Sequence, residues 1–495
     1  MEAATKDVAN PSGETADFEV HPMILDSDPP SKAGSSLTGL GWMVTGFFVV
    51  ADLVGAGVVA MPVAFLDTGL VGGIIFMVVI CFIYAVTGHQ LGENWLIMQE
   101  RWPIYRQHCR TPYPEMAIRS MGEFWRIVAY VNCYLTMFGM AVVYVLIPAR
   151  TIWNFAEEFG STIPYCYFIL MLAAFILPFT YLRSPADFWW VIVIAMLLTY
   201  ISVIAAYIGI GMDAPVCLQH VRQTEPTFLS ILLKLGIFLF AFNGHNVFPT
   251  IQHDMREPRD FTKAIVVGFI ICSLLYMPFS IFAYVVYGNS MRDSVVDSLQ
   301  IRWTRFTSDI SIGLHCILVL ILTINPINQQ FENIFHVSQS FGWHRVIIRT
   351  VIMLAVTFVA VTIPDFTPVM NVFGSTTIPI SCVVLPTLFN LWLNASRYDK
   401  EKGDWTIPST MEVVKRTPLW KLIYSIVVLV VVIIGGVIGT VEGIRNFASV
   451  NFSAPCYVRP FLSESYDVYK GSQINCCGAY RNITAHSYIT DECKS

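Results

Sequence analysis

The stretch Phe240-Ala-Phe-Asn-Gly-His-Asn-Val-Phe248, followed by Pro249, decides how this chain folds. It places a glycine, two asparagines and a histidine inside an apolar segment that is long enough to cross a membrane. Lipid offers no partner to a backbone amide, so non-helical backbone at that depth must be buried in protein or line a cavity. The stretch therefore predicts a membrane helix that is interrupted partway.

A second interruption lies five predicted spans earlier, in Val50-Ala-Asp-Leu-Val-Gly-Ala-Gly-Val58, which is followed by Pro62. Interrupted spans at corresponding places in the two halves of a chain mark the substrate site of a transporter. We therefore predict a membrane carrier of small solutes.

The composition of the chain agrees with this prediction. Hydrophobic residues make up 55% of the 495 residues and charged residues 13%, against about 25% charged in soluble proteins. The net charge of −5 gives no reason to expect a nucleic-acid partner. We expect one integral membrane unit.

Eleven segments are apolar over the ~20 residues that a helix needs to cross a hydrocarbon core about 30 Å thick. They are roughly 42–66, 69–96, 126–149, 163–182, 187–211, 227–251, 263–287, 307–330, 346–363, 368–393 and 419–441. We expect an all-α protein with eleven transmembrane helices, in which spans 1 and 6 are broken and belong to two inverted repeats of five spans. Residues 1–38 are expected to form a disordered cytosolic tail, 39–441 the transporter domain and 442–495 a C-terminal tail outside the cytosol.

Lysine and arginine gather in the loops after the even-numbered spans, and such loops face the cytosol. These seventeen residues are Arg101, Arg106, Arg110, Arg119, Arg126, Arg183, Arg256, Arg259, Lys263, Arg345, Arg349, Arg397, Lys400, Lys402, Lys415, Arg416 and Lys421. The opposite loops contain five: Arg150, Arg222, Arg292, Arg302 and Arg305. The asymmetry predicts a cytosolic N-terminus and an extracellular or lumenal C-terminus.

The C-terminal tail independently indicates the same orientation. It holds N-glycosylation sequons at Asn451 and Asn482, which can be used only on the lumenal side. Six cysteines fall on that side, where disulfides form: Cys166, Cys217, Cys456, Cys476, Cys477 and Cys493. They include no CxxC pair and no suitably spaced histidines, so disulfides are favoured over zinc, and the pairing stays open.

Each interruption creates half-helices whose ends face the protein interior. An N-terminal end carries about half a positive charge and suits a carboxylate, whereas C-terminal ends and unwound carbonyls suit a cation or an ammonium group. Together they suit a zwitterion such as an amino acid. Gly55, Ala56, Gly57 and Gly244 would let a ligand approach bare main chain, although small residues also mediate helix packing.

Asp52 is a carboxylate within a span, which is costly unless it is paired, protonated or hydrated. It could carry a proton, bind sodium or balance a substrate ammonium group; a structural hydrogen bond is the alternative. His245 and His315 are further ion-coupling candidates because imidazole titrates near neutral pH, with interhelical hydrogen bonding as their alternative. Phe242 and Asn243 complete the candidate substrate site.

Enzymatic chemistry finds no support in the sequence, which lacks GxSxG, HExxH, P-loop and kinase motifs. We expect no cofactor and no metal site, only a coupling ion. The expected partners are a small amino acid substrate and membrane lipid.

The segment from Phe240 to Pro258 resembles the sixth span and following loop of the amino acid/auxin permeases, where a glycine–histidine pair precedes Phe-Pro and a Met-x-x-Pro turn. Val54-Gly-Ala-Gly-Val-Val-Ala-Met-Pro62 is similar to the first span of that family. The resemblance covers roughly residues 38–441. It implies the LeuT-like fold of the APC superfamily and secondary active transport of amino acids, often driven by protons.

Several functions stay open beside a proton-coupled amino acid symporter. The chain could be a sodium-coupled carrier or a vesicular exchanger, or it could be a channel or amino acid sensor with a transporter fold. The plasma membrane is the expected location, and an endolysosomal or vesicle membrane is the alternative.

The charge asymmetry makes a testable prediction about topology. A tag at the N-terminus should be reached by antibody only after cells are permeabilised, and a tag at the C-terminus should be reached in intact cells if the protein is at the plasma membrane. An N-terminal tag that is accessible without permeabilisation would contradict the predicted orientation.

Overall fold

The computed structural model describes residues 39–107, 109, 111–181, 189–223, 225–337, 342–449, 455–458, 461 and 475–485. All of them belong to one compact unit, Gly39–Ser495. The predicted tail 1–38 and the candidate residues Asn451 and Cys493 lie outside the described residues.

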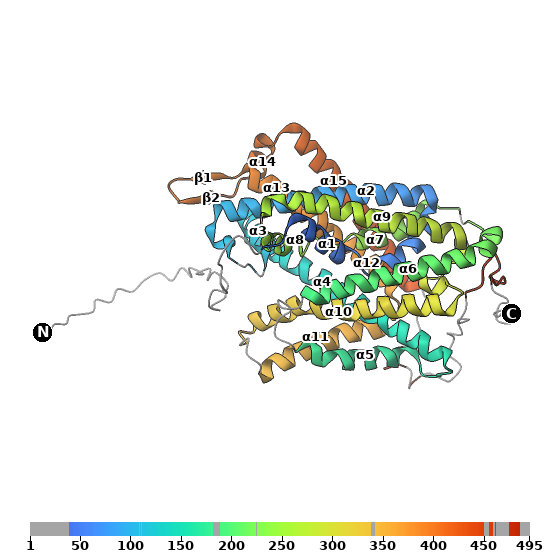
Figure 1. Ribbon diagram of the computed structural model, residues 1–495. Helices are drawn as coiled ribbons and strands as arrows, with labels where there is room; N and C mark the ends of the chain where they lie inside the picture. Colours follow the sequence, from blue (N-terminus) through green and yellow to red (C-terminus); the bar gives the residue numbers. More distant parts are fainter. Residues whose placement is uncertain are drawn as a thin grey trace. The chain divides into compact units, whose positions relative to one another are not determined.

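The unit is built almost entirely of helices (Figure 1). They are α1 (Trp42–Leu53), α2 (Gly57–Arg101), α3 (Pro112–Met121), α4 (Glu123–Glu158), α5 (Tyr165–Thr180), α6 (Trp189–His220), α7 (Phe228–Ala241), α8 (Phe248–His253), α9 (Phe261–Tyr287), α10 (Arg302–Ile334), α11 (Trp343–Thr362), α12 (Phe366–Pro379), α13 (Leu385–Ala395), α14 (Thr410–Arg416) and α15 (Leu419–Ser449).

Shorter elements connect these helices. They are the 3₁₀ turns η1 (Pro103–Arg106), η3 (Pro258–Asp260), η4 (Gly288–Ser290) and η5 (Val296–Ser298), the π-helical turn η6 (Ile380–Val384), and the strands β1 (Arg397–Asp399) and β2 (Asp404–Thr406). The two strands form an antiparallel hairpin that projects beside α14 (Figure 1). This hairpin was not predicted from the sequence.

Each of the eleven predicted segments coincides with helical structure. Eight helices among the described residues are long and apolar enough to cross a membrane, and the shorter apolar helices Trp42–Leu53, Tyr165–Thr180 and Ser230–Ala241 account for the other predicted spans. The helical membrane architecture is therefore confirmed, whereas the count of eleven spans stays a prediction.

Both predicted interruptions are present. Helix α1 ends at Leu53, Val54 is extended, and α2 begins at Gly57; helix α7 ends at Ala241 and α8 begins only at Phe248. Helix α2 then turns at Gly69, whose φ of +69° is a conformation that glycine adopts without steric cost. This turn separates the first predicted span from the second.

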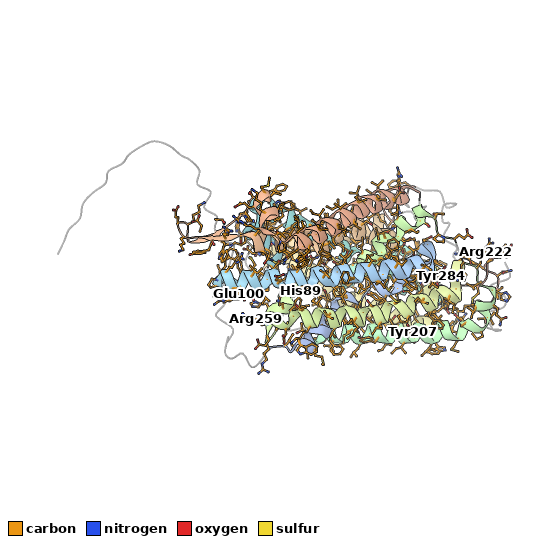
Figure 2. The ribbon with its side chains drawn as sticks, turned by 90° about the horizontal axis from the view of Figure 1, so that it is seen from above. His89, Glu100, Tyr207, Arg222, Arg259 and Tyr284 are labelled. Carbon is orange, nitrogen blue, oxygen red and sulfur yellow. A yellow bond between two sulfur atoms is a disulfide. The ribbon has the colours of Figure 1, made fainter. Side chains whose placement is uncertain are left out.

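The interrupted helices pack against the long intact ones. Helix α9 contacts both α1 and α2, α12 lies between α7 and α4, and α10 packs against α4 and α6. In Figure 2, Glu100 of α2 and Arg259 lie at one end of the unit, and Arg222 and Tyr284 lie at the other. An ion pair of 3.1 Å joins Arg259 to Glu100.

Two arginines used to predict the orientation are buried. Arg345 and Arg349 of α11 are 3% and 0% exposed, and both pair with Glu332 of α10, at 3.2 and 2.5 Å. Arg349 also donates to the carbonyl of Thr180 in α5. These two arginines link α11 to α10 and α5. The predicted orientation of the chain therefore depends on the other basic residues of the same loops.

The crossing of α7 and α12 makes a prediction about stability. A Cβ on Gly374 would collide with the carbonyl of Gly236, so Gly374→Ala should destabilise the protein by about 1–3 kcal/mol through overpacking. Gly211 of α6 is the matched control, because a Cβ there has no atom from elsewhere in the structure within 4 Å. Thermal unfolding of the purified variants measures the difference; equal melting temperatures would contradict the close approach of the helices.

Candidate functional site

The two interruptions touch each other through their main chains. A Cβ built on Gly57 would lie 2.7 Å from Cα of Ala241 and 2.8 Å from its Cβ, so only glycine fits at this position. Tyr276 of α9 donates a hydrogen bond to the carbonyl of Leu53 at 2.9 Å, and its hydroxyl lies 3.2 Å from the carbonyl of Ala241. One phenol therefore caps the C-terminal ends of both α1 and α7, and the two interruptions form a single site.

Asp52 lies in the last turn of α1 and reaches across to the second interruption. Its carboxylate lies against Gly244, where a Cβ would collide with Oδ2 and would lie 2.9 Å from Cδ2 of Leu53. Oδ2 is buried and has no hydrogen-bond partner among the described residues. The structure thus brings together Asp52 and Gly244, two candidates from opposite halves of the sequence.

His315 of α10 faces the first interruption. Its Nε2 lies 3.1 Å from a Cβ built on Gly55, and the hydroxyl of Tyr144 lies 3.6 Å from the same point. Its Nδ1 lies 2.9 Å from the carbonyl of Ala195 and 2.8 Å from Oγ1 of Thr199. A carbonyl only accepts, so Nδ1 carries a proton, and in the neutral imidazole Nε2 is an acceptor. Nε2 has no partner among the described residues.

His245 points away from these groups and toward α2. Its Nε2 lies 3.1 Å from both the carbonyl of Tyr84 and Oγ1 of Thr87, and its ring packs edge-on against Tyr84 and beside Phe248. The side chain is fully buried. The interhelical hydrogen bonding that was the alternative for both histidines is therefore present, between His245 and α2 and between His315 and α6. Of the two, His315 lies at the first interruption.

The remaining candidates in the second interruption are also buried. The ring of Phe242 packs against Tyr276 at a centroid distance of 5.5 Å. Nδ2 of Asn243 lies 3.0 Å from the sulfur of Met140, and its Oδ1 accepts from Cys382 at 3.3 Å. In the first interruption, Ala56 is buried directly before α2.

Three residues at this site were not predicted: Tyr276, Tyr144 and Cys382. Cys382 lies in the π-helical turn η6, which follows Pro379 and precedes Pro386. Such turns are frequent at functional sites, and the two prolines were the only sequence signal for it. A tyrosine within an apolar span gives no comparable signal, because its partner is chosen by packing.

The predicted disulfide cysteines that lie among the described residues are disulfide-bonded. Cys166 pairs with Cys456, and Cys217 pairs with Cys477; Cys476 is also disulfide-bonded. Asn482 is exposed and directly follows a turn. No group of three or more His, Cys, Asp or Glu side chains that could hold a metal occurs in the part of the chain that the structure describes.

The sequence matches a family model described as "Transmembrane amino acid transporter protein" over residues 38–440. Among curated proteins, it is 24% identical over 389 residues to amino acid transporter AVT3C of Arabidopsis thaliana, covering 74% of this chain and 87% of the relative. It is also 24% identical over 380 residues to lysine histidine transporter-like 1 of Arabidopsis thaliana, covering 71% and 80%.

Solved structures resemble this chain at low sequence identity. The inward-facing conformation of Mhp1 is 10% identical with a TM-score of 0.49, covering 86% of this chain and 91% of that one. MhsT in complex with L-phenylalanine is 11% identical with a TM-score of 0.47, covering 82% and 99%.

The contact between Asp52 and Gly244 makes a prediction about uptake. Gly244→Ala should lower amino acid uptake at least about tenfold, because its methyl group displaces a carboxylate held at the junction of the interruptions. Gly72→Ala is the control, since a Cβ there makes only an ordinary contact of 3.6 Å with Thr68. Uptake is compared at equal surface abundance. If Gly244→Ala transports as well as Gly72→Ala and the wild type, the contact has no role in transport.

Proposed function

This chain belongs to the transmembrane amino acid transporter family, and from that premise we propose that it is a proton-coupled symporter. It transports amino acids and is not an enzyme. In the proposed cycle, the interruptions at Gly55–Gly57 and 242–247 hold the amino acid, and a proton bound beside them moves with it.

The observation that carries this proposal is the environment of Asp52. A charged carboxylate without a partner is costly away from water, and Oδ2 of Asp52 is buried without one among the described residues. Binding a proton removes this charge, so the free energy of the site depends on whether the proton is present. A residue with this property can link proton movement to the conformational change of the helices around it.

Sodium is the competing coupling ion, and the local oxygens fit it less well. Hard cations in proteins take several oxygen ligands. The carbonyls of Leu53 and Ala241, which end the two half-helices next to Asp52, already lie against the hydroxyl of Tyr276. The other unpartnered acceptor at the first interruption is a nitrogen, Nε2 of His315. This set favours a proton over sodium.

The same groups suit the two charges of an amino acid. Helix α2 begins at Gly57, and the first N–H groups of a helix attract a carboxylate. Asp52, which lies against Gly244, and His315, which lies against Gly55, offer acceptors to an ammonium group. A small neutral or a basic amino acid would satisfy this arrangement, and lysine histidine transporter-like 1 is a relative whose name refers to basic substrates.

We also propose that the N-terminus is cytosolic and that residues 442–495 lie on the extracellular or lumenal side. The disulfides Cys166–Cys456 and Cys217–Cys477 support this orientation, because such bonds persist in oxidising compartments. The plasma membrane is the proposed location, and an endolysosomal or vesicle membrane has the same orientation. Glycosylation at Asn482 fits the same side, where the residue is exposed.

The test of coupling is uptake of a labelled amino acid panel into proteoliposomes, with pH and sodium gradients imposed independently. Wild-type protein should accumulate substrate under an inward proton gradient. Asp52→Asn keeps the shape of the side chain but removes its proton site, so it should lose gradient-driven accumulation and keep exchange of substrate across the membrane. Asp52→Glu should shift the pH dependence of uptake.

Each of the other outcomes of this experiment supports one of the alternative functions. Accumulation under a sodium gradient alone makes the protein a sodium symporter, and exchange without accumulation makes it an exchanger. Binding without uptake indicates a sensor, and flux that does not saturate indicates a channel. An Asp52→Asn variant with unchanged accumulation and pH profile would remove Asp52 from the coupling mechanism.

A further inference from the structure

The loop 288–301 closes over the first interrupted helix. The backbone N–H of Val295 donates to the carbonyl of Val59 in α2 at 3.1 Å. Two residues later, Asp297 forms an ion pair of 3.1 Å with Arg150 of α4 and accepts from Asn154 of α4 at 3.0 Å. The loop therefore bridges α2 and α4.

This loop is packed like a protein interior. Val295, Ser298 and Gln300 are fully buried, and the side chain of Asp297 is 8% exposed. Most connecting loops lie on the surface and are mobile, whereas this one makes specific contacts with two helices. Movement of α2 away from α4 on this face requires those contacts to break.

The C-terminal segment 475–485, called here the strap, is hydrogen-bonded to the same loop. Asn475 donates to the carbonyl of Ser298 at 3.2 Å, and the backbone N–H of Ala485 donates to Oε1 of Gln300 at 2.7 Å. Nε2 of Gln300 lies 3.0 Å from Sγ of Cys477. Both the oxygen and the nitrogen of the Gln300 side-chain amide thus contact the strap.

A disulfide holds the strap at this position. Cys477 is bonded to Cys217 near the end of α6, and the backbone N–H of Gln300 donates to Asp213 of α6 at 3.0 Å. The strap and the loop are therefore both anchored to α6. A covalent tether keeps the strap at a high effective concentration beside the loop, so that weak hydrogen bonds suffice to hold it.

We infer that the strap is a working part of the transporter: it positions the loop 288–301 over the first interrupted helix and stabilises the closed arrangement of this face. Gln300 is the positioning residue, and the Cys217–Cys477 disulfide maintains its contacts. When the strap is lost, the loop opens more often. The inference depends on transport by this fold and does not depend on which ion drives it.

The second disulfide is a natural control. Cys456, bonded to Cys166 at the start of α5, is followed by Tyr457, whose ring stacks on Phe358 of α11 at 5.8 Å. Among the described residues, this segment contacts α5 through the disulfide and α11 through Tyr457. Removing its disulfide therefore tests for a general effect of losing a disulfide on this face.

The experiment measures opening of the loop directly. Ser294, which is 7% exposed in the loop, is replaced in Ser294→Cys and labelled with a membrane-impermeant maleimide in the full-length purified protein. Added to this background, Cys217→Ser with Cys477→Ser should raise the labelling rate about fivefold or more, as expected when several hydrogen bonds that oppose opening are lost. Cys166→Ser with Cys456→Ser should leave the rate within about twofold. The same two double variants, made without Ser294→Cys, measure the background labelling of the other cysteines.

Gln300→Leu provides a test that keeps both disulfides. It removes the amide contacts with the strap and should also raise labelling of Ser294→Cys, with a lower maximal uptake rate. If the Cys217→Ser/Cys477→Ser protein does not purify as a folded species, Gln300→Leu alone tests whether the strap holds the loop closed. Unchanged labelling in Gln300→Leu, or an equal rise in both disulfide variants, would overturn the inference. Because labelling needs no substrate, these outcomes are separate from failure of proton coupling.

Discussion

The main-chain contact between the two interrupted helices is the constraint on which the site depends. Gly57 lies against Ala241 with no room for a side chain, and Tyr276 joins the carbonyls of Leu53 and Ala241. Without the interruptions these carbonyls would be satisfied inside continuous helices. Because the helices end here, their polar termini must meet partners, and one phenol from α9 supplies a partner to both. The close approach then brings Asp52 against Gly244.

The polar groups around this contact divide into satisfied and unsatisfied ones. Asn243 is hydrogen-bonded within the protein through both ends of its amide, and His245 is held through Nε2 while its buried Nδ1 has no partner among the described residues. Asp52 and His315 keep buried acceptor atoms without partners among the described residues. A low dielectric makes such atoms costly, and a proton or a substrate ammonium group lowers that cost. Among the groups with unsatisfied atoms, Asp52 and His315 are the ones on which transport chemistry is proposed to depend.

The loop 288–301 meets a different requirement: it has to stay closed over α2, a helix that is proposed to move during transport. Asp297 supplies an ion pair to α4, Val295 supplies a backbone hydrogen bond to α2, and Gln300 joins the loop to the strap. The hydrogen bonds among these contacts each contribute little to stability, and the largely buried ion pair is the strongest of them. The Cys217–Cys477 disulfide ties the strap to α6, and the sulfur of Cys477 itself lies against the amide of Gln300.

The sequence by itself determined the membrane class, the approximate helices, both interruptions and the presence of disulfides. These follow from local rules, since a span needs about 20 apolar residues and lipid tolerates broken backbone only inside protein. Only the tertiary structure decided which groups meet: His315 beside Gly55, the hydrogen bonds that turn His245 toward α2, Tyr276 between the two helix ends, and Cys217 with Cys477. Those pairings join residues far apart in the chain, and their choice depends on how whole helices pack, which no local pattern of residues records.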